Sequence, residues 1–431
     1  MLRDSVWDRD DVLCKMLENT RIPRFMDLKQ SFDRKKVENL EEELERGFLG
    51  IEDVFSSLEG KTVAVTAGSR GVANIAKIIR SIVSRLRKSG ALPFIVPAMG
   101  SHGGATAEGQ KELLAALGIT EDSTGAPIHS SMDVIRLGTS KSGETVFIDK
   151  LASAADGIVV VGRVKPHTCF RGAYESGLMK MMTIGLGKQR GAEVAHRNGF
   201  GYMARNVEEC GSLVLEKAPV LFGVATVENA YEETAIVSVL RKEEIKRKEP
   251  LLLEKAKRFM PSLPFDSFDI LIVDQIGKNF SGDGMDPNVT GLYMTPYASG
   301  GPSFQRCVVL DVCDESHGNS NGIGTADFST KRLFDKTDFD SGYVNALTST
   351  VVAGVKMPMI LRNDEHAVKA AIFSCNDIDK ETVRIVRIAN SLHIQHLSVS
   401  ESLLEEAREK ERVQILSDLY KLPFNASGNL F

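Results

Sequence analysis

The chain has 431 residues, a formal net charge of -5 and 42% hydrophobic residues, a composition typical of globular proteins. Single cores stop growing at roughly 250–300 residues, so this length predicts two or three domains. The slightly acidic balance argues against nucleic acid as a partner, and no apolar run reaches the ~18–20 residues that a membrane helix needs. Because the N-terminal segment MLRDSVWDRDD is too charged for a signal peptide, we expect a cytoplasmic protein.

The N-terminal half alternates short apolar runs with segments of helical periodicity. Its first 60 residues are charged and irregular, apart from a helix expected near 36–48. From Lys61 onward the pattern is regular and predicts a β-α-β-α order, which implies a parallel sheet with helices on its faces. The predicted strands are 62–66, 93–98 and 156–161, and the predicted helices are centred on 75–86 and 113–117.

A second region begins after the segment PSLPF at 261–265, which has the composition of a linker. It contains predicted strands at 269–273, 306–312, 357–361 and 383–388, followed by a charged helix near 400–416. We therefore predict two α/β domains with mostly parallel, Rossmann-like sheets and an active-site cleft between them. The N-terminal domain covers 1–262 and is completed by a C-terminal helix in 400–431, and the C-terminal domain covers 266–398.

Residues suited to catalysis follow the ends of several predicted strands. Arg70, His102 and His167 each lie just beyond a strand, in a loop that contains Gly or Pro. In open parallel sheets ligands bind at this edge, so separate loops can bring the three side chains together. Gln275 and Lys278 follow a strand of the second domain in the same way. One such arginine or histidine alone is most often structural, but three at successive strand ends favour a functional site.

Other motifs are weak. Gly185-Leu186-Gly187 is followed by Gly191, one residue too late for a dinucleotide-binding fingerprint, and no phosphate-binding P-loop is present. The six cysteines form no C-x-x-C pair and are expected to be buried thiols. Cys169 stands slightly apart because it lies two residues after His167.

Taken together, these residues resemble the nickel-pincer lactate racemase family over about 62–324. Arg70 in Ser-Arg-Gly matches the arginine of the family's Thr-Arg-Pro, and His102 in Gly-Ser-His matches the histidine of its Gly-Thr-His. His167 in Pro-His-x-x-Phe matches the histidine of the Pro-His-Phe-Phe-Ala-Gly segment. Gln275 and Lys278 keep the family's Gln-x-x-Lys spacing.

Two further positions match the part of the family that binds the cofactor. Lys180 corresponds to the cofactor-tethering lysine, with two or three extra residues between it and His167. His196 lies sixteen residues after Lys180, as the family's nickel-ligand histidine does after its lysine. The resemblance implies a nickel-pincer nucleotide, pyridinium-3-thioamide-5-thiocarboxylic acid mononucleotide, with His196 as the protein ligand of nickel.

The resemblance also implies a racemase or epimerase that inverts a 2-hydroxy acid, lactate-like or a sugar acid. His102 and His167 would take the hydroxyl proton, while hydride moves to the cofactor and returns to the other face of the carbon. Arg70 would grip the carboxylate, and Gln275 and Lys278 would hold substrate oxygens. The implied partners are the hydroxy acid and the enzymes that build the cofactor.

Three alternatives remain open at this stage. A zinc-dependent hydrolase could use His102, His167, His196 and Cys169, although the chain has no H-E-x-x-H motif. A non-catalytic hydroxy-acid-binding protein would tolerate loss of the loop histidines, and a nicotinamide-dependent dehydrogenase is disfavoured by the missing glycine fingerprint. His317, in a Gly- and Asn-rich loop after a strand, is a further candidate for substrate contact.

Overall fold

The computed structural model describes residues 12–431, which form two compact units. The central unit runs from Asp33 to Met260, and the terminal unit combines residues 12–32 with Pro261–Phe431. The division after Met260 falls beside the linker expected at 261–265. The charged N-terminal segment 1–11, on which the signal-peptide argument rested, lies outside the described residues.

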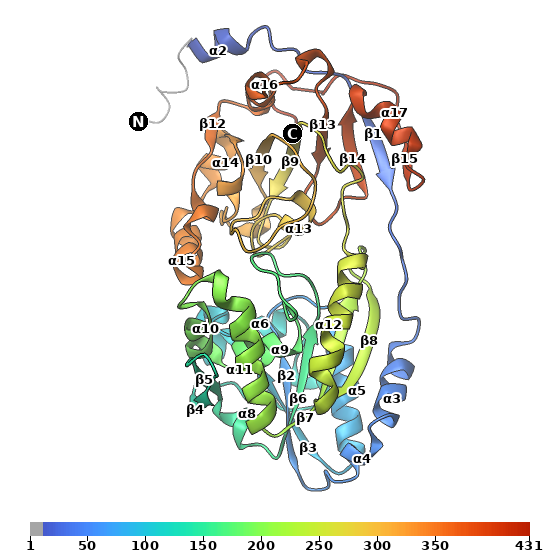
Figure 1. Cartoon of the computed structure of the whole chain (residues 1–431), viewed down its shortest axis with the longest axis vertical. Helices are drawn as coiled ribbons and strands as arrows, with labels where there is room; N and C mark the ends of the chain where they lie inside the picture. The colour runs from blue at the N-terminus through green and yellow to red at the C-terminus, as the bar shows by residue number, and fades with distance from the viewer. Residues whose placement is uncertain (1–11) are drawn as a thin grey trace. The chain divides into compact units, whose positions relative to one another are not determined.

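The central unit is built on a five-stranded sheet (Figure 1). In spatial order its strands are β3 (Leu92–Pro97), β2 (Thr62–Ala67), β6 (Gly157–Arg163), β7 (Val220–Glu228) and β8 (Thr234–Arg241). The first four run parallel, and β8 pairs antiparallel with β7. Pro93 and Pro97 are tolerated in β3 because it is an edge strand, where a missing N–H removes few ladder hydrogen bonds.

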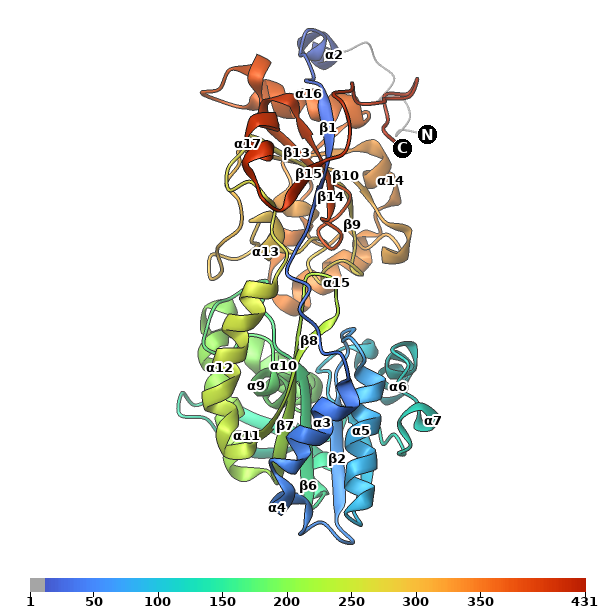
Figure 2. The ribbon, with the colours of Figure 1, turned by 90° about the vertical axis from the view of Figure 1, so that its right-hand side faces the viewer.

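Helices cover both faces of this sheet, as Figure 2 shows. Apolar side chains of α3, α4 and α5 pack with those of β2 and β7 into one core. On the other face α9 contacts β6, and α12 contacts β7. The helices of the unit are α3 (Leu40–Leu49), α4 (Glu52–Phe55), α5 (Ile75–Lys88), α6 (Ala107–Ala116), α7 (Glu121–Thr124), α8 (Lys150–Ala154), α9 (Leu178–Lys180), α10 (Lys188–His196), α11 (Met203–Lys217) and α12 (Lys242–Phe259). A separate antiparallel hairpin is formed by β4 (Val134–Thr139) and β5 (Thr145–Asp149).

The terminal unit contains an eight-stranded mixed sheet. Its strands in spatial order are β12 (Met359–Leu361), β11 (Phe328–Thr330), β10 (Arg306–Val312), β9 (Ile270–Ile276), β13 (Ile385–Ile388), β14 (His396–Ser400), β1 (Phe25–Gln30) and β15 (Val413–Ile415). The five strands from β12 to β13 are parallel, and the other three are added antiparallel. Alternate residues of β9 enter separate cores on the two faces of the sheet. The helices are α2 (Val12–Leu17), α13 (Pro287–Thr290), α14 (Lys331–Lys336), α15 (Phe339–Ser349), α16 (Asp364–Ser374) and α17 (Leu404–Glu409).

The predicted α/β class with mostly parallel sheets is confirmed, but the ends of the chain are placed differently from the prediction. The expectation that 400–431 completes the N-terminal domain was wrong, because β14 and β15 both pair with β1 in the terminal unit. The charged helix expected at 400–416 is reduced to α17, since Val413–Ile415 forms a strand instead. The strand β1 was not anticipated at all.

No helix among residues 12–431 combines the length and the apolar character that crossing a membrane requires.

Candidate active site

The three predicted loops leave the same edge of the central sheet. Strand β2 lies between β3 and β6, and all three run parallel, so their C-terminal ends are neighbours. Arg70 follows β2, His102 follows β3 and His167 follows β6. A hydrogen bond between Ser69 Oγ and His102 Nδ1 joins the first two loops directly.

Left-handed glycines shape the His102 loop. Gly100 has φ 60° and Gly103 has φ 66°, and a Cβ at Gly103 would lie 2.6 Å from the backbone nitrogen of Gln110. Residues with a side chain are therefore excluded at Gly103 by strain and by a clash with backbone. In the tautomer in which Nδ1–H of His102 donates to Ser69 Oγ, Nε2 keeps its lone pair and can act as a general base.

The hydrogen bond at Nδ1 of His167 fixes the state of its ring. The backbone N–H of Cys169 donates to Nδ1 at 3.0 Å, so the neutral ring carries its proton on Nε2. Burial lowers the pKa of His167 well below its ordinary value, and electrostatic interactions with Lys180, His196, Lys165 and Arg171 act in the same direction. His167 is therefore neutral at pH 7 and presents an N–H donor in this arrangement.

A buried carboxylate, Glu175, holds the His167 loop. Its side chain is fully buried and accepts a hydrogen bond from the backbone N–H of His167 at 2.7 Å. It also forms ion pairs with Arg171 at 3.4 Å and Lys257 at 3.5 Å. Arg171 in turn donates to the carbonyl oxygen of His167 at 2.5 Å. Sequence reasoning missed Glu175, because no local pattern reveals a contact made through loop folding.

Lys180 and His196 lie at the ends of two short α-helices that are joined by a π-helical turn and a tight turn. Lys180 ends α9, a π-helical turn follows at Met181–Gly185, and His196 ends α10. The positive charge of Lys180 lowers the pKa of both His167 and His196, which places the three side chains within electrostatic range of one another. π-Turns within helices are frequent at functional sites.

The tautomer of His196 is set by its own helix. Its Nδ1 lies 2.7 Å from the carbonyl oxygen of Ala192, which can only accept, so Nδ1 carries the proton. Burial is the largest influence on His196 and lowers its pKa, although the Ala192 bond opposes this. The Nε2 lone pair therefore belongs to a neutral imidazole, the form that binds metal ions.

Phe200 lies between the two imidazoles and was not predicted from the sequence. Its ring centroid is 6.1 Å from that of His167 and 5.5 Å from that of His196, the latter in an edge-to-face arrangement. The ring of Phe170 contacts that of His167 with a centroid distance of 4.4 Å and a tilt of 35° between the ring planes. These aromatic side chains surround the histidines with apolar surface, which explains the loss of solvation that lowers their pKa values.

Residues 21–206 of the chain match the family model of the lactate racemase N-terminal domain. The resemblance predicted for about 62–324 is therefore confirmed for its part up to residue 206. A solved structure described as the lactate racemase apoprotein from Thermoanaerobacterium thermosaccharolyticum is also similar to the chain, with 13% sequence identity and a TM-score of 0.47. That similarity covers 79% of this chain and 87% of the other. No curated protein sequence matches the chain.

The segment that resembles the lactate racemase N-terminal domain contains five of the predicted site residues, Arg70, His102, His167, Lys180 and His196. His196 offers one neutral imidazole nitrogen, a ligand type that suits nickel, so the residues of this segment would fit a nickel-containing cofactor.

Gln275 and Lys278 lie in the terminal unit, outside the match to the lactate racemase domain. Gln275 is the penultimate residue of β9, and Lys278 is the second residue of the loop after it. The Nζ of Lys278 donates to the carbonyl oxygen of Gly282 at 2.6 Å, and its backbone N–H donates to Ser316 Oγ at 3.1 Å. Their part in binding substrate stays a prediction.

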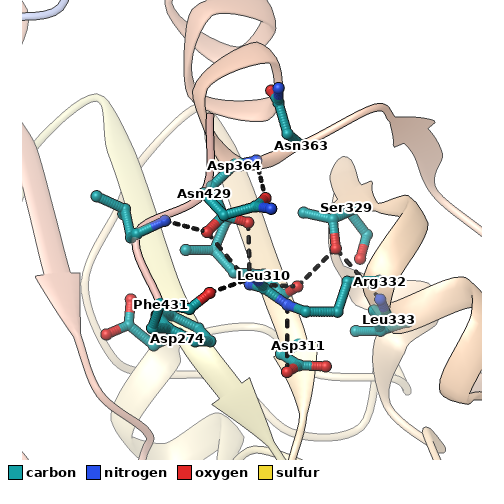
Figure 3. Close-up of polar contacts among 12 residues, drawn as sticks. Asp274, Leu310, Asp311, Ser329, Arg332, Leu333, Asn363, Asp364, Asn429 and Phe431 are labelled. Carbon is teal, nitrogen blue, oxygen red and sulfur yellow. Dashed lines mark hydrogen bonds and ion pairs between the residues drawn. The ribbon is translucent and has the colours of Figure 1, made fainter. Parts of the chain in front are cut away.

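Carboxylates near the ends of β9 and β10 are paired with cations (Figure 3). Arg332 joins Asp311 at 3.2 Å to Asp364 at 3.0 Å, and Asp274 pairs with Arg387 at 2.8 Å. Within the described part of the chain, no group of three or more His, Cys, Asp or Glu side chains is arranged to hold a metal ion. These pairs stabilise the terminal unit and supply no obvious catalytic group.

Two residues left open by the sequence have modest roles in the structure. Cys169 is buried, and its backbone N–H, rather than its thiol, orients His167. His317 adopts a left-handed conformation with φ 48° in the loop after β10, next to Ser316, which receives the Lys278 hydrogen bond. Neither residue gains a catalytic assignment from these contacts.

Proposed function

We propose that the chain is a racemase or epimerase of 2-hydroxy acids that works with a nickel-pincer nucleotide held by Lys180 and His196. The observation that carries the proposal is the hydrogen bond from His196 Nδ1 to Ala192, which leaves the Nε2 lone pair of a neutral ring available to a metal ion. The match to the lactate racemase N-terminal domain over 21–206 supports it. When bound, the nucleotide supplies a centre that accepts hydride from the substrate carbon and returns it.

Side chains of the protein would transfer the hydroxyl proton and bind the substrate. His102 takes the hydroxyl proton at Nε2 while Ser69 holds its Nδ1. His167 is neutral and donates its Nε2 proton to the substrate oxygen. Its Nε2 could act as a base only with the ring proton on Nδ1, which requires release of the hydrogen bond from Cys169. Arg70 binds the substrate carboxylate through two parallel hydrogen bonds, for which a guanidinium is suited. Gln275 and Lys278 remain the expected contacts for other substrate oxygens.

Isotope labelling tests the proposal. The protein is produced together with the cofactor-building enzymes and incubated with single enantiomers of 2-hydroxy acids, lactate and sugar acids included, that carry deuterium at the inverted carbon. Hydride transfer and return predicts inverted product that retains the deuterium in ordinary water. Inversion with loss of the label to solvent would show deprotonation at carbon instead and refute the mechanism.

Two variants identify the bases. His102→Ala and His167→Ala should each lower kcat by ~10²–10⁴-fold, the usual value of positioned proton transfer, without unfolding the protein. Normal turnover in both variants would remove these residues from the mechanism. Hydrolysis of esters or amides with stoichiometric zinc would support the hydrolase alternative, and binding of hydroxy acids without turnover would support the binding-protein alternative.

A further inference from the structure

A fully buried lysine, Lys188, begins the helix that ends at His196. Its side chain has no exposed surface, and its ammonium group has three oxygen neighbours. These are the carbonyl oxygen of Pro97 at 2.5 Å, Oε1 of Gln110 at 3.1 Å and Oδ2 of Asp149 at 3.2 Å. The first two are hydrogen bonds, and the third is an ion pair with a carboxylate that is itself fully buried.

Gln110 relays this contact to the His102 loop. It lies in α6, is fully buried, and donates from Nε2 to the carbonyl oxygens of Gly100 at 3.0 Å and His102 at 3.2 Å. Its Oε1 faces Lys188 at the same time. The amide therefore joins a buried cation to the backbone on both sides of residue 101.

The third partner, Asp149, ties the same cation to the turn that precedes α10. Its Oδ1 accepts a hydrogen bond from the backbone N–H of Ala152 at 2.8 Å, and its own N–H donates to the carbonyl oxygen of Leu186 at 2.7 Å. Gly185 approaches so closely that a Cβ there would lie 2.7 Å from the carbonyl oxygen of Ala98. The turn between Lys180 and His196 is thus fixed against the strand end that carries His102.

Stability alone gives a weak reason for this arrangement. A buried ion pair must offset a large desolvation penalty on each ion, and well-packed apolar residues often stabilise a core equally well. Lys188 also has φ 53°, a left-handed conformation that is unfavourable for a residue with a side chain. Unfavourable backbone conformations of this kind are usually retained at sites where function requires a particular local geometry.

We propose that Lys188 and Gln110 are positioning residues that hold the His102 loop in register with the Lys180–His196 segment. In the proposed racemase this register keeps His102, the base, at a constant distance from His196, the metal ligand. This part of the inference rests on the proposed function. Neither residue touches the substrate or the cofactor. Their effect reaches the reaction through the backbone of residues 100–102.

Gln110→Met tests the relay with the least disturbance, since it leaves the Lys188–Asp149 pair in place. The matched control is Gln189→Met, because Gln189 is the next residue after Lys188 but is exposed and bonds only to Glu193 at 3.0 Å. Hydrogen–deuterium exchange of the full chain without cofactor should show amides of 99–106 exchanging at least tenfold faster in Gln110→Met and unchanged in the control. With cofactor, kcat should fall ~10–100-fold with KM changed by less than threefold, the pattern of a misplaced catalytic group.

Exchange of 99–106 that is unchanged in Gln110→Met would overturn the positioning role, whatever the activity. If Gln110→Met does not fold, Gln110→Asn keeps a polar head that is one methylene too short to reach both carbonyls, and the same exchange pattern is expected. Faster local exchange in a chain that racemises no hydroxy acid would refute the proposed function while leaving the positioning network intact.

Discussion

Removal of the Glu175 carboxylate is the sharpest test of how the His167 loop is held. In Glu175→Ala the part-buried N–H of His167 loses its acceptor at 2.7 Å, and an unsatisfied donor costs up to about 1–3 kcal/mol when it is buried. Breaking a fully buried ion pair costs about 3–5 kcal/mol, but the side chains of Arg171 and Lys257 are 29% and 36% exposed and can regain water. We therefore expect the free energy of unfolding to fall by about 2–3 kcal/mol.

Urea denaturation at pH 7 measures this loss, with Glu254→Ala as the matched control. Glu254 pairs with the same Lys257 at 2.9 Å, but its side chain is 62% exposed, so its removal should change stability by no more than about 0.5 kcal/mol. Glu175→Ala should also lower kcat by about 10²-fold, because the His167 ring loses its position. Equal stability of the two variants would refute the view that Glu175 holds this loop.

Three further predictions concern neighbouring groups. Burial raises the pKa of Glu249 to about 8, so the contribution of this carboxyl group to stability falls as pH rises from about 4.5 to 8. Glu249→Gln should therefore become progressively more stable than the natural protein over this range, by a few kcal/mol at pH 8. A difference in urea midpoints that stays constant with pH would contradict this. His196→Ala should reduce bound nickel at least tenfold, as measured by elemental analysis of protein made with the cofactor-building enzymes, with an unchanged circular dichroism spectrum. Ser69→Ala removes the Nδ1 partner of His102 and should lower kcat about tenfold, and an unchanged kcat would show that Ser69 does not orient the ring.

Sequence patterns predicted the central unit well because its strands are short apolar runs bounded by glycine loops. The strands expected at 62–66, 93–98 and 156–161 correspond to β2, β3 and β6, and their parallel order places Arg70, His102 and His167 at one edge. These features depend on local periodicity and on a general rule for parallel sheets. The strands and their shared edge can therefore be predicted from the sequence.

The features that were missed depend on contacts between distant parts of the chain. In β1 the buried residues alternate, but its partners lie about 370 residues away in β14 and β15, and charged neighbours mask the pattern. The segment 400–416 has the charge pattern of a surface helix, yet pairing with β1 selects a strand at Val413–Ile415. Glu175, Phe200 and Lys188 likewise gain their roles only from packing that spacing does not reveal.

The central claim is that His196 completes a nickel site on an organic cofactor held near Lys180. Intact mass and metal content of the full chain, produced with the cofactor-building enzymes, test it together. The account predicts about one nickel per chain, an added mass that accompanies it, and loss of both in His196→Ala. An unmodified mass with stoichiometric zinc, or nickel binding that survives His196→Ala unchanged, would contradict it.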